Sequence, residues 1–171
     1  AERAWADGQI FQQDIVPITI KDRKGSYDFV EDETYRKGMK LEDLSKLRPT
    51  FKEGGTVTAG NASGINDGSA VVLMMTSEKA KELGLKPIVK YITAVSAAVH
   101  PSIMGYAPVP AIEKLEKKTG ISREQIGLFE LNEAFAAQAA ACVQDLHLDP
   151  EKVNPNGGAI ALGHAVGCTG C

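Results

Sequence analysis

The sequence lacks any apolar run approaching the roughly 20 residues that a helix needs to cross a bilayer. It contains only 3 cysteines in 171 residues, too few for the disulfide scaffold of a small secreted domain. Residues 1–14 show no positively charged start followed by an apolar stretch, the pattern of a signal peptide. These absences argue against a membrane-spanning or disulfide-stapled protein, and we expect a cytoplasmic one.

The excess of negative over positive charge is also small. A net charge of −3 gives no global reason to expect nucleic acid or an acidic lipid surface as a partner. Apolar residues make up 43% and charged residues 24%, as in soluble globular chains. The chain opens on Ala1 as if within a helix and closes on small residues at Cys171. We therefore expect a fragment of a longer protein.

In the first half of the chain, the sequence predicts strands before and after a polar segment. Stretches rich in β-branched residues at 15–20 and 27–30 flank a Lys24-Gly25 turn signal, which predicts a hairpin. Residues 31–47 are polar, with leucines at helical spacing, and indicate a charged surface segment. The run 70–75 is continuously apolar, which is typical of a strand buried on both faces.

The second half alternates predicted helices with apolar runs. Helices are predicted at 78–83, where Ser77 can serve as the cap, and at 110–118. The β-branched run 88–99 predicts another strand, and Asn132 is expected to open a further helix. Strands that alternate with helices of about ten to fifteen residues predict an α/β layered fold.

Three segments carry an unusual pattern: GGTVTAGNASGINDG at 54–68, NEAF at 132–135 and NGGAIALGH at 156–164. Together, in this order, they closely resemble the C-terminal part of thiolases, a family that includes acetyl-CoA acetyltransferases. The resemblance runs through nearly the whole chain. It implies a thiolase-like layered fold, with a mixed β-sheet and helices on both faces. It also implies that residues 1–50 end an N-terminal region with a charged CoA-binding segment, and that residues 51–171 are a truncated C-terminal domain.

His164 stands between Gly163 and Ala165. A lone histidine is more often structural, but small neighbours let a ligand approach the backbone, and imidazole moves protons near neutral pH. In thiolases the matching histidine activates the nucleophilic cysteine and helps to hold the thioester oxygen, so the resemblance implies that His164 is catalytic. The family usually has proline where Ala165 stands, which questions the rigidity of the loop more than the chemistry.

Asn132 has a structural alternative as a helix cap, with its side-chain oxygen accepting an amide hydrogen bond. The side-chain NH2 would then stay free to donate. In thiolases the matching asparagine positions a water that completes an oxyanion hole, so the resemblance implies a second catalytic residue here. Glu133 is expected to serve packing and local hydrogen bonding. Ala134 and Phe135 resemble pocket-wall positions.

The first motif resembles the coenzyme A site of the family. A run of glycine, alanine and serine lets a pantetheine arm lie along exposed backbone. The alternative is a plain tight turn, which the sequence predicts at 66–68. The resemblance implies that Ser63 hydrogen-bonds the pantetheine, with Phe51, Ala59 and Gly60 beside it.

Two further positions match the family more weakly. Arg36 corresponds to a residue near the nucleotide end of coenzyme A, although taken alone it indicates a solvated surface residue. An anionic ligand on an acidic protein needs local cations, and several cluster in sequence: Arg23, Lys24, Arg36, Lys37 and Lys40. Met104 resembles a substrate-pocket residue, and an ordinary apolar contact is the alternative.

The cysteines do not match the reactive positions of the family. Thiolases use a nucleophilic cysteine in their N-terminal half and an acid/base cysteine near the C-terminus. Here Cys142 lies on an apolar helix face, which indicates a core position, while Cys168 and Cys171 form a C-x-x-C pair, a weak metal or redox signal. We therefore expect this chain alone to be inactive.

For the parent protein, the resemblance implies Claisen condensation of two acetyl-CoA molecules or thiolysis of a 3-ketoacyl-CoA. Coenzyme A thioester is the substrate, with no cofactor and no metal, and the parent is expected to be a homo-oligomer. A ketoacyl synthase would show a second histidine where Asn132 and Glu133 stand. The other open class is a non-catalytic, coenzyme-A-binding or structural piece, which the full reading frame would distinguish.

Overall fold

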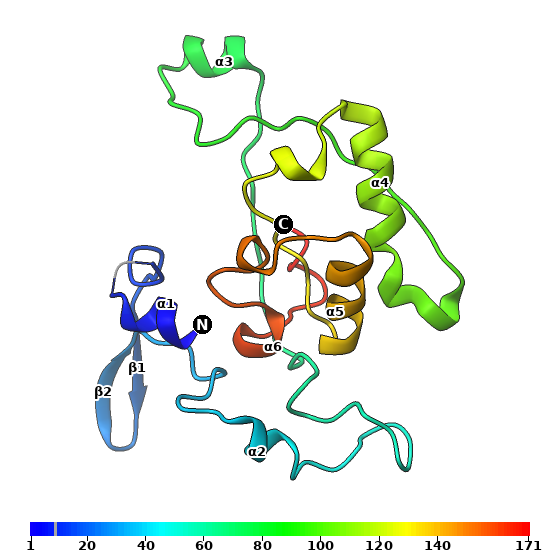
Figure 1. The fold of residues 1–171 in the computed structure, drawn as a ribbon. Coiled ribbons are helices and arrows are strands. Elements are labelled where there is room, and N and C mark those ends of the chain that lie inside the picture. The colour runs from blue at the N-terminus through cyan, green and yellow to red at the C-terminus, as the bar shows by residue number, and fades with distance from the viewer. Residues whose placement is uncertain (9) are drawn as a thin grey trace.

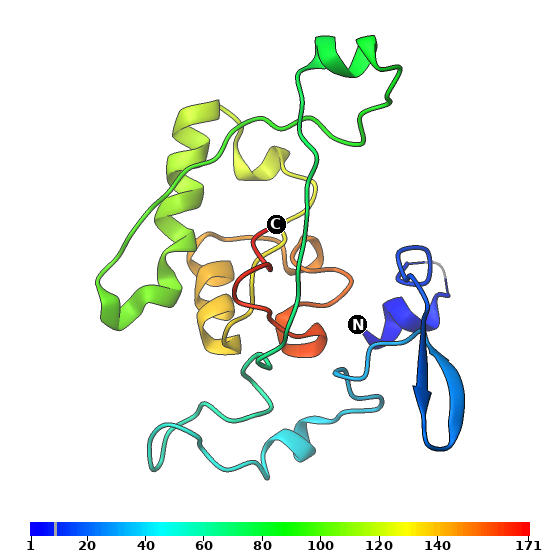
Figure 2. The same ribbon diagram turned by 180° about the vertical axis from the view of Figure 1, so that it is seen from behind.

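The computed structural model describes residues 1–8 and 10–171. In chain order its elements, with η marking 3-10 helices, are α1 (Glu2–Ala6), β1 (Ile18–Asp22), β2 (Gly25–Phe29), α2 (Leu41–Leu44), α3 (Ser77–Glu82), η1 (Pro101–Tyr106), α4 (Pro108–Thr119), η2 (Arg123–Gln125), α5 (Ala136–Asp145), η3 (Pro150–Lys152) and α6 (Ala159–Leu162). Helices α4, α5 and α6 gather in one part of the molecule, the hairpin and α1 in another, and α3 stands apart (Figures 1 and 2). Within the described ranges, no helix has both the length and the apolar character to cross a membrane.

The predicted hairpin is confirmed. β1 pairs with β2 in antiparallel register, with Ile18 opposite Phe29. The Asp22 carboxylate holds the turn, because it accepts the backbone N–H groups of Lys24 at 2.7 Å and Gly25 at 3.1 Å. An aspartate that bonds the backbone two residues on is a common way to close such a turn.

The core lies between α4, α5 and the segments that follow them. Its buried residues are Val109, Leu131, Ala139, Cys142, Leu146 and Leu148. Because α5 places Ala139, Cys142 and Leu146 at spacings of three and four, one face of this helix is apolar. Cys142 is fully buried, as the sequence predicts, and this burial raises the pKa of its thiol.

The helix predicted at 110–118 is confirmed as α4, which ends at a left-handed Gly120. The side chain of Arg123 then reaches back to Glu116, with Nε–Oε1 at 2.9 Å and Nη2–Oε2 at 2.6 Å. Its Nη1 also donates to the carbonyl of Leu146 at 2.9 Å, at the end of α5. One guanidinium therefore joins the ends of the two core helices.

The predicted start of α5 is wrong. The helix begins at Ala136, so Asn132 does not cap it, and the side chain of Gln138 accepts the Phe135 N–H at 3.2 Å instead. Residues 132–135 are not helical because their backbone bonds to another segment, as described below. The Asn132 side chain therefore makes no capping hydrogen bond to α5.

The other short helices differ from prediction in smaller ways. Helix α3 begins at Ser77, and the hydroxyl of Thr76 rather than that of Ser77 accepts the Lys79 N–H, at 3.2 Å. In the polar segment 31–47 only Leu41–Leu44 is helical. The rest of that segment is exposed loop, apart from the half-buried Thr34 and the buried Tyr35.

The apolar runs 70–75 and 88–99 are extended but belong to no ladder among the described residues. The prediction that residues 70–75 form a strand buried on both faces is wrong for the described chain, because Val71 is 95% exposed. In the run 88–99, Ile88 is 100% exposed, and half-buried positions begin only at residue 93. In both ribbon views the two runs form long extended paths to and from α3 (Figures 1 and 2). These runs have the backbone shape of strands without partner strands in the part of the chain that is described.

The second run lies against α4. Lys114 and Lys118 of that helix donate to the carbonyls of Ser96 at 2.8 Å and Ala94 at 3.1 Å. Exposure alternates along residues 93–100 between half-buried and exposed positions. A period of two is what an extended strand shows when one of its faces is covered.

Candidate active site

The first motif runs alongside the second. The backbone N–H of Ser63 donates to the carbonyl of Ala134 at 3.0 Å, and that of Ala136 donates to the carbonyl of Asn61 at 2.9 Å. These bonds frame an antiparallel β-bridge. The predicted pantetheine-binding serine therefore lies beside the predicted pocket wall.

Asn66 connects the first motif to the third. Its N–H donates to the carbonyl of His164 at 3.4 Å, and its Oδ1 accepts the His164 N–H at 3.1 Å. A Cβ on Gly163, whose φ is 99°, would lie 2.5 Å from that Oδ1, so the residue before the histidine must be glycine. The prediction of a tight turn at 66–68 is wrong, because Asn66 pairs with His164 instead and the three residues form no turn.

The side chains of Asn132 and His164 meet. Asn132 Nδ2 lies 3.4 Å from His164 Nε2, and on the other side of the ring His164 Nδ1 lies 2.9 Å from Thr169 Oγ1. His164 is half-buried and Asn132 is exposed, so both remain reachable from solvent. The two side chains therefore face each other, while their catalytic roles stay a prediction.

Asn154, which the sequence does not single out, supports Asn132. Its side chain accepts the N–H of Leu131 at 2.8 Å and donates to the carbonyl of the same residue at 2.7 Å, as a neighbouring strand would. Glu133 accepts from Asn154 Nδ2 at 3.2 Å and from the N–H of Ile160 at 3.3 Å. Glu133 thus has the local hydrogen-bonding role that the sequence predicts.

Three other predicted site residues lie in or next to the first motif. Phe51 meets Phe135 edge to face, with ring centroids 6.0 Å apart. Gly60 lies so close to α2 that a Cβ would fall 2.6 Å from the Leu44 side chain. Ala59 beside it is exposed.

Met104 and Arg36 form no hydrogen bond or ion pair with His164 or Asn132 among the described residues. Met104 lies in η1, which packs on α5, and its side chain is 63% exposed. Arg36 is exposed in the polar segment, between Tyr35 and Lys37.

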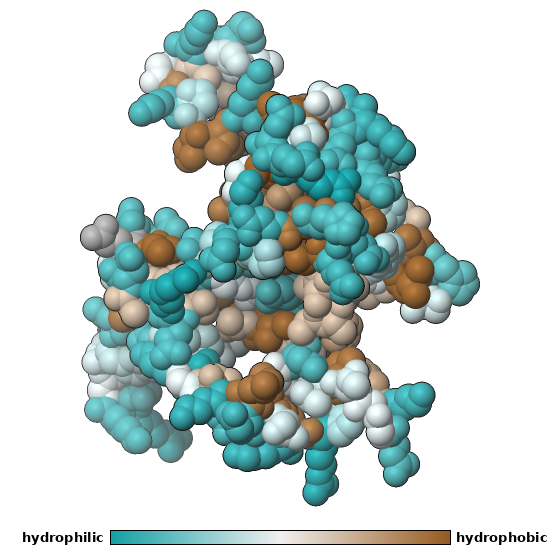
Figure 3. All heavy atoms as spheres, viewed as in Figure 1, coloured by the Kyte–Doolittle hydropathy of each residue, from teal (hydrophilic) through white to brown (hydrophobic). Residues whose placement is uncertain are grey.

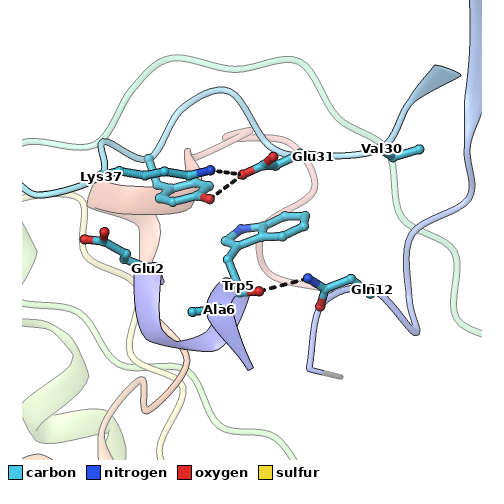
Figure 4. A pocket seen from close by; sticks show the side chains of 8 residues that line it. Glu2, Trp5, Ala6, Gln12, Val30, Glu31 and Lys37 are labelled. Carbon is cyan, nitrogen blue, oxygen red and sulfur yellow. Dashed lines mark hydrogen bonds and ion pairs between the residues drawn. The ribbon is translucent and has the colours of Figure 1, made fainter. Parts of the chain in front are cut away.

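A separate cavity of about 440 Å³ lies between α1 and residues 30–37 (Figure 4). Lys37 pairs with Glu31 at 2.8 Å, and the Tyr35 hydroxyl donates to the same carboxylate. Hydrogen bonds from Lys37 and Tyr35 hold the pKa of Glu31 below its ordinary value. Trp5 stacks parallel to Tyr35, with ring centroids 5.9 Å apart. None of the predicted site residues lines this cavity.

Comparison with known proteins agrees with this arrangement. The family models "Thiolase, N-terminal domain" and "Thiolase, C-terminal domain" match residues 1–78 and 85–171. A protein of Staphylococcus aureus strain MSSA476 named "Probable acetyl-CoA acyltransferase" is 53% identical over 171 residues, which are 99% of this chain and 43% of that protein.

Solved structures show the same likeness. The crystal structure of the Bacillus anthracis acetyl-CoA acetyltransferase has a TM-score of 0.92 and 50% identity, covering 99% of this chain and 43% of that chain. The dimeric peroxisomal thiolase of Saccharomyces cerevisiae has a TM-score of 0.89 and 45% identity, with 99% and 43% covered.

The chain spans about 43% of the length of the curated relatives it matches. The thiolase-like α/β fold predicted from the sequence is confirmed by the structural likeness, and the described residues contribute helices and a small antiparallel sheet to it. Since family models cover residues 1–78 and 85–171, this chain belongs to the thiolase family.

Proposed function

We propose that the protein to which this chain belongs is an acyl-CoA acyltransferase. It would condense two acetyl-CoA molecules or cleave a 3-ketoacyl-CoA by thiolysis. The observation that carries the proposal is the meeting of Asn132 Nδ2 and His164 Nε2 at 3.4 Å, beside the segment that contains Ser63. The names of the acetyl-CoA acyltransferase and acetyltransferase relatives support the same chemistry.

In the proposed reaction His164 acts as the base. Its Nε2 takes the proton of a nucleophilic cysteine, and the thiolate attacks the thioester carbonyl. The bond between the acyl carbon and the sulfur of coenzyme A then breaks, and the departing thiolate of coenzyme A takes the proton from His164. We place that cysteine outside this chain, because none of its cysteines corresponds to the reactive positions of the family and Cys142 is fully buried. Charge develops on the thioester oxygen as the thiolate attacks.

Asn132 supplies the complementary donor. Its amide faces the same space as His164 Nε2 and can hold a water against the developing oxyanion. A pre-positioned donor of this kind lowers a barrier by about 3–4 kcal/mol. We place the pantetheine arm along residues 59–63 and Phe51, and the acyl group against Ala134 and Phe135.

The remaining assignments of the proposal concern the whole protein. We place Arg36 near the nucleotide end of coenzyme A and Met104 at the acyl pocket. We also propose a cytoplasmic homo-oligomer that needs no metal or other cofactor for this chemistry. The yeast neighbour, described as a dimeric thiolase, supports the oligomer.

The test is thiolysis of acetoacetyl-CoA by the full-length protein and its variants. His164→Ala should abolish turnover, and Asn132→Ala should lower kcat by roughly 100- to 1,000-fold. His147→Asn is the matched control, because His147 is exposed and has a left-handed φ of 53° that asparagine tolerates.

Two outcomes would count against the proposal. The first is full activity in His164→Ala. The second is turnover by residues 1–171 alone that depends on one of their cysteines, since this would require a different nucleophile. A full-length protein that binds coenzyme A without turnover would instead favour the non-catalytic alternative.

A further inference from the structure

We propose that Thr169 fixes the tautomer of His164, so that Nδ1 carries the ring proton and Nε2 presents its lone pair toward Asn132. Thr169 is then a positioning residue, because it acts on the imidazole and not on substrate. The importance of this tautomer for catalysis rests on the proposed function. The tautomer itself follows from contacts within the chain.

The first argument comes from the Asn132 side of the ring. The NH2 group of an asparagine only donates, and Nδ2 lies 3.4 Å from His164 Nε2. A proton on Nε2 of the neutral ring would place two donors face to face. The contact is favourable only when Nε2 is the acceptor, which places the proton on Nδ1.

The second argument comes from the Thr169 side. Its Oγ1 lies 2.9 Å from His164 Nδ1 and also 2.9 Å from the carbonyl oxygen of Ala165. A carbonyl only accepts, and a hydroxyl has a single hydrogen. When that hydrogen is given to Ala165, the lone pair of Oγ1 accepts from Nδ1–H. All three contacts are satisfied by one arrangement of protons.

The backbone places Thr169 without relying on its side chain. The N–H groups of Cys168 and Thr169 both donate to the carbonyl of Ala165 at 2.9 Å, and the resulting turn brings Thr169 back to the ring. The backbone of His164 is held separately by Asn66, through bonds of 3.1 and 3.4 Å. Removing the hydroxyl should therefore alter the proton arrangement while the loop stays in place.

The experiment is nitrogen NMR of the full-length protein labelled with 15N-histidine, with His164→Gln to identify the signals of this ring. Wild type and Thr169→Ser, which keeps the hydroxyl, should show the Nδ1–H tautomer. Thr169→Val keeps the branched shape of the side chain but lacks the oxygen that accepts the hydrogen bond from Nδ1 of His164. The ratio of Nδ1–H to Nε2–H should then fall by roughly 2- to 10-fold, the worth of one net hydrogen bond.

Thr119→Val is the matched control. Thr119 also donates to the carbonyl four residues earlier, that of Leu115, at 2.8 Å. This variant should leave the signals of His164 unchanged. An Nε2–H tautomer in the wild type overturns the proposal even if Thr169→Val does not fold. An unchanged ratio of the Nδ1–H to the Nε2–H tautomer in a folded Thr169→Val protein also overturns the proposal.

Thiolysis assays separate this inference from the proposed function. A shifted tautomer with a matching loss of kcat and restored activity in Thr169→Ser supports both. A shifted tautomer with unchanged kcat supports the role of Thr169 and counts against His164 as the base.

Discussion

Three asparagine side chains surround the candidate site, and each makes a different kind of contact. Asn66 pairs with the backbone of His164, Asn154 pairs with the backbone of Leu131, and Asn132 faces the imidazole. An amide both donates and accepts, so one side chain can satisfy an N–H and a carbonyl together. Such pairing replaces the strand ladder that these short segments lack in the described chain.

At this residue scale, Asn154→Ala should destabilise the chain. The substitution leaves the N–H and the carbonyl of Leu131 without their partner, and Leu131 is only 9% exposed. Each unpaired buried group costs about 1–3 kcal/mol. The left-handed φ of 46° at this position costs alanine roughly 1–2 kcal/mol more.

Urea unfolding measures this loss, and Asn154→Gly separates its two parts. Glycine loses the same hydrogen bonds but tolerates the positive φ, so it should be less destabilising than alanine by about 1 kcal/mol. An Asn154→Ala midpoint equal to that of the wild type would show that Asn154 does not support the Leu131 backbone.

At the scale of elements, α4 and α5 are joined by apolar packing and by the Arg123 link. The Glu116 and Arg123 side chains are 19% and 23% exposed, so their bidentate pair is partly shielded from water. The hydrogen bonds from Arg123 hold the pKa of Glu116 below its ordinary value of 4.5. A carboxylate whose pKa is lowered by folding stabilises the folded state only while it is ionised.

The stability contributed by Glu116 should therefore depend on pH. It is fully present above the ordinary value of 4.5 and is lost as the pH falls through the lowered folded value. At neutral pH, Glu116→Gln should cost about 1.5–3 kcal/mol, as for hydrogen bonds to charged groups. The difference from wild type should shrink below pH 4.5.

Chemical unfolding at a series of pH values checks this dependence. Glu113→Gln is the control, because Glu113 lies exposed on the same helix. The assignment is contradicted if Glu116→Gln destabilises the chain equally at neutral and acidic pH, or no more than Glu113→Gln does.

At the scale of the whole molecule, much apolar surface is exposed. Accessibility reaches 95% at Val71, 81% at Leu73, 100% at Ile88 and 82% at Val89. Apolar residues are visible among the polar ones over the face in Figure 3. Contiguous apolar surface and open strand edges recruit partners. Because the curated relatives are longer than this chain, their additional residues are candidates to cover these runs.

Residues 1–171 on their own should therefore self-associate. Sedimentation should show species larger than the 18.2 kDa monomer, with binding of a dye that reports apolar surface. Ile88→Lys places a charge where the side chain is fully exposed, so it should weaken association without unfolding the chain. A dye-silent monomer at high concentration would show that these runs are covered within the chain.

The sequence alone determined the features that depend on near neighbours and on the three motifs. The hairpin around Lys24-Gly25 and the helix predicted at 110–118 follow from the preferences of residues a few positions apart. The motifs also indicated the thiolase family, which the comparisons confirm.

Only the tertiary structure decided how the site is assembled. Asn66 reaches His164 across 98 positions, Asn132 reaches it across 32, and Asn154 reaches Leu131 across 23. Local patterns do not encode such pairings, so Asn132 was expected to cap a helix that begins later. An apolar run likewise predicts an extended backbone but not where its partner strand lies, because that depends on which other segments fold against it.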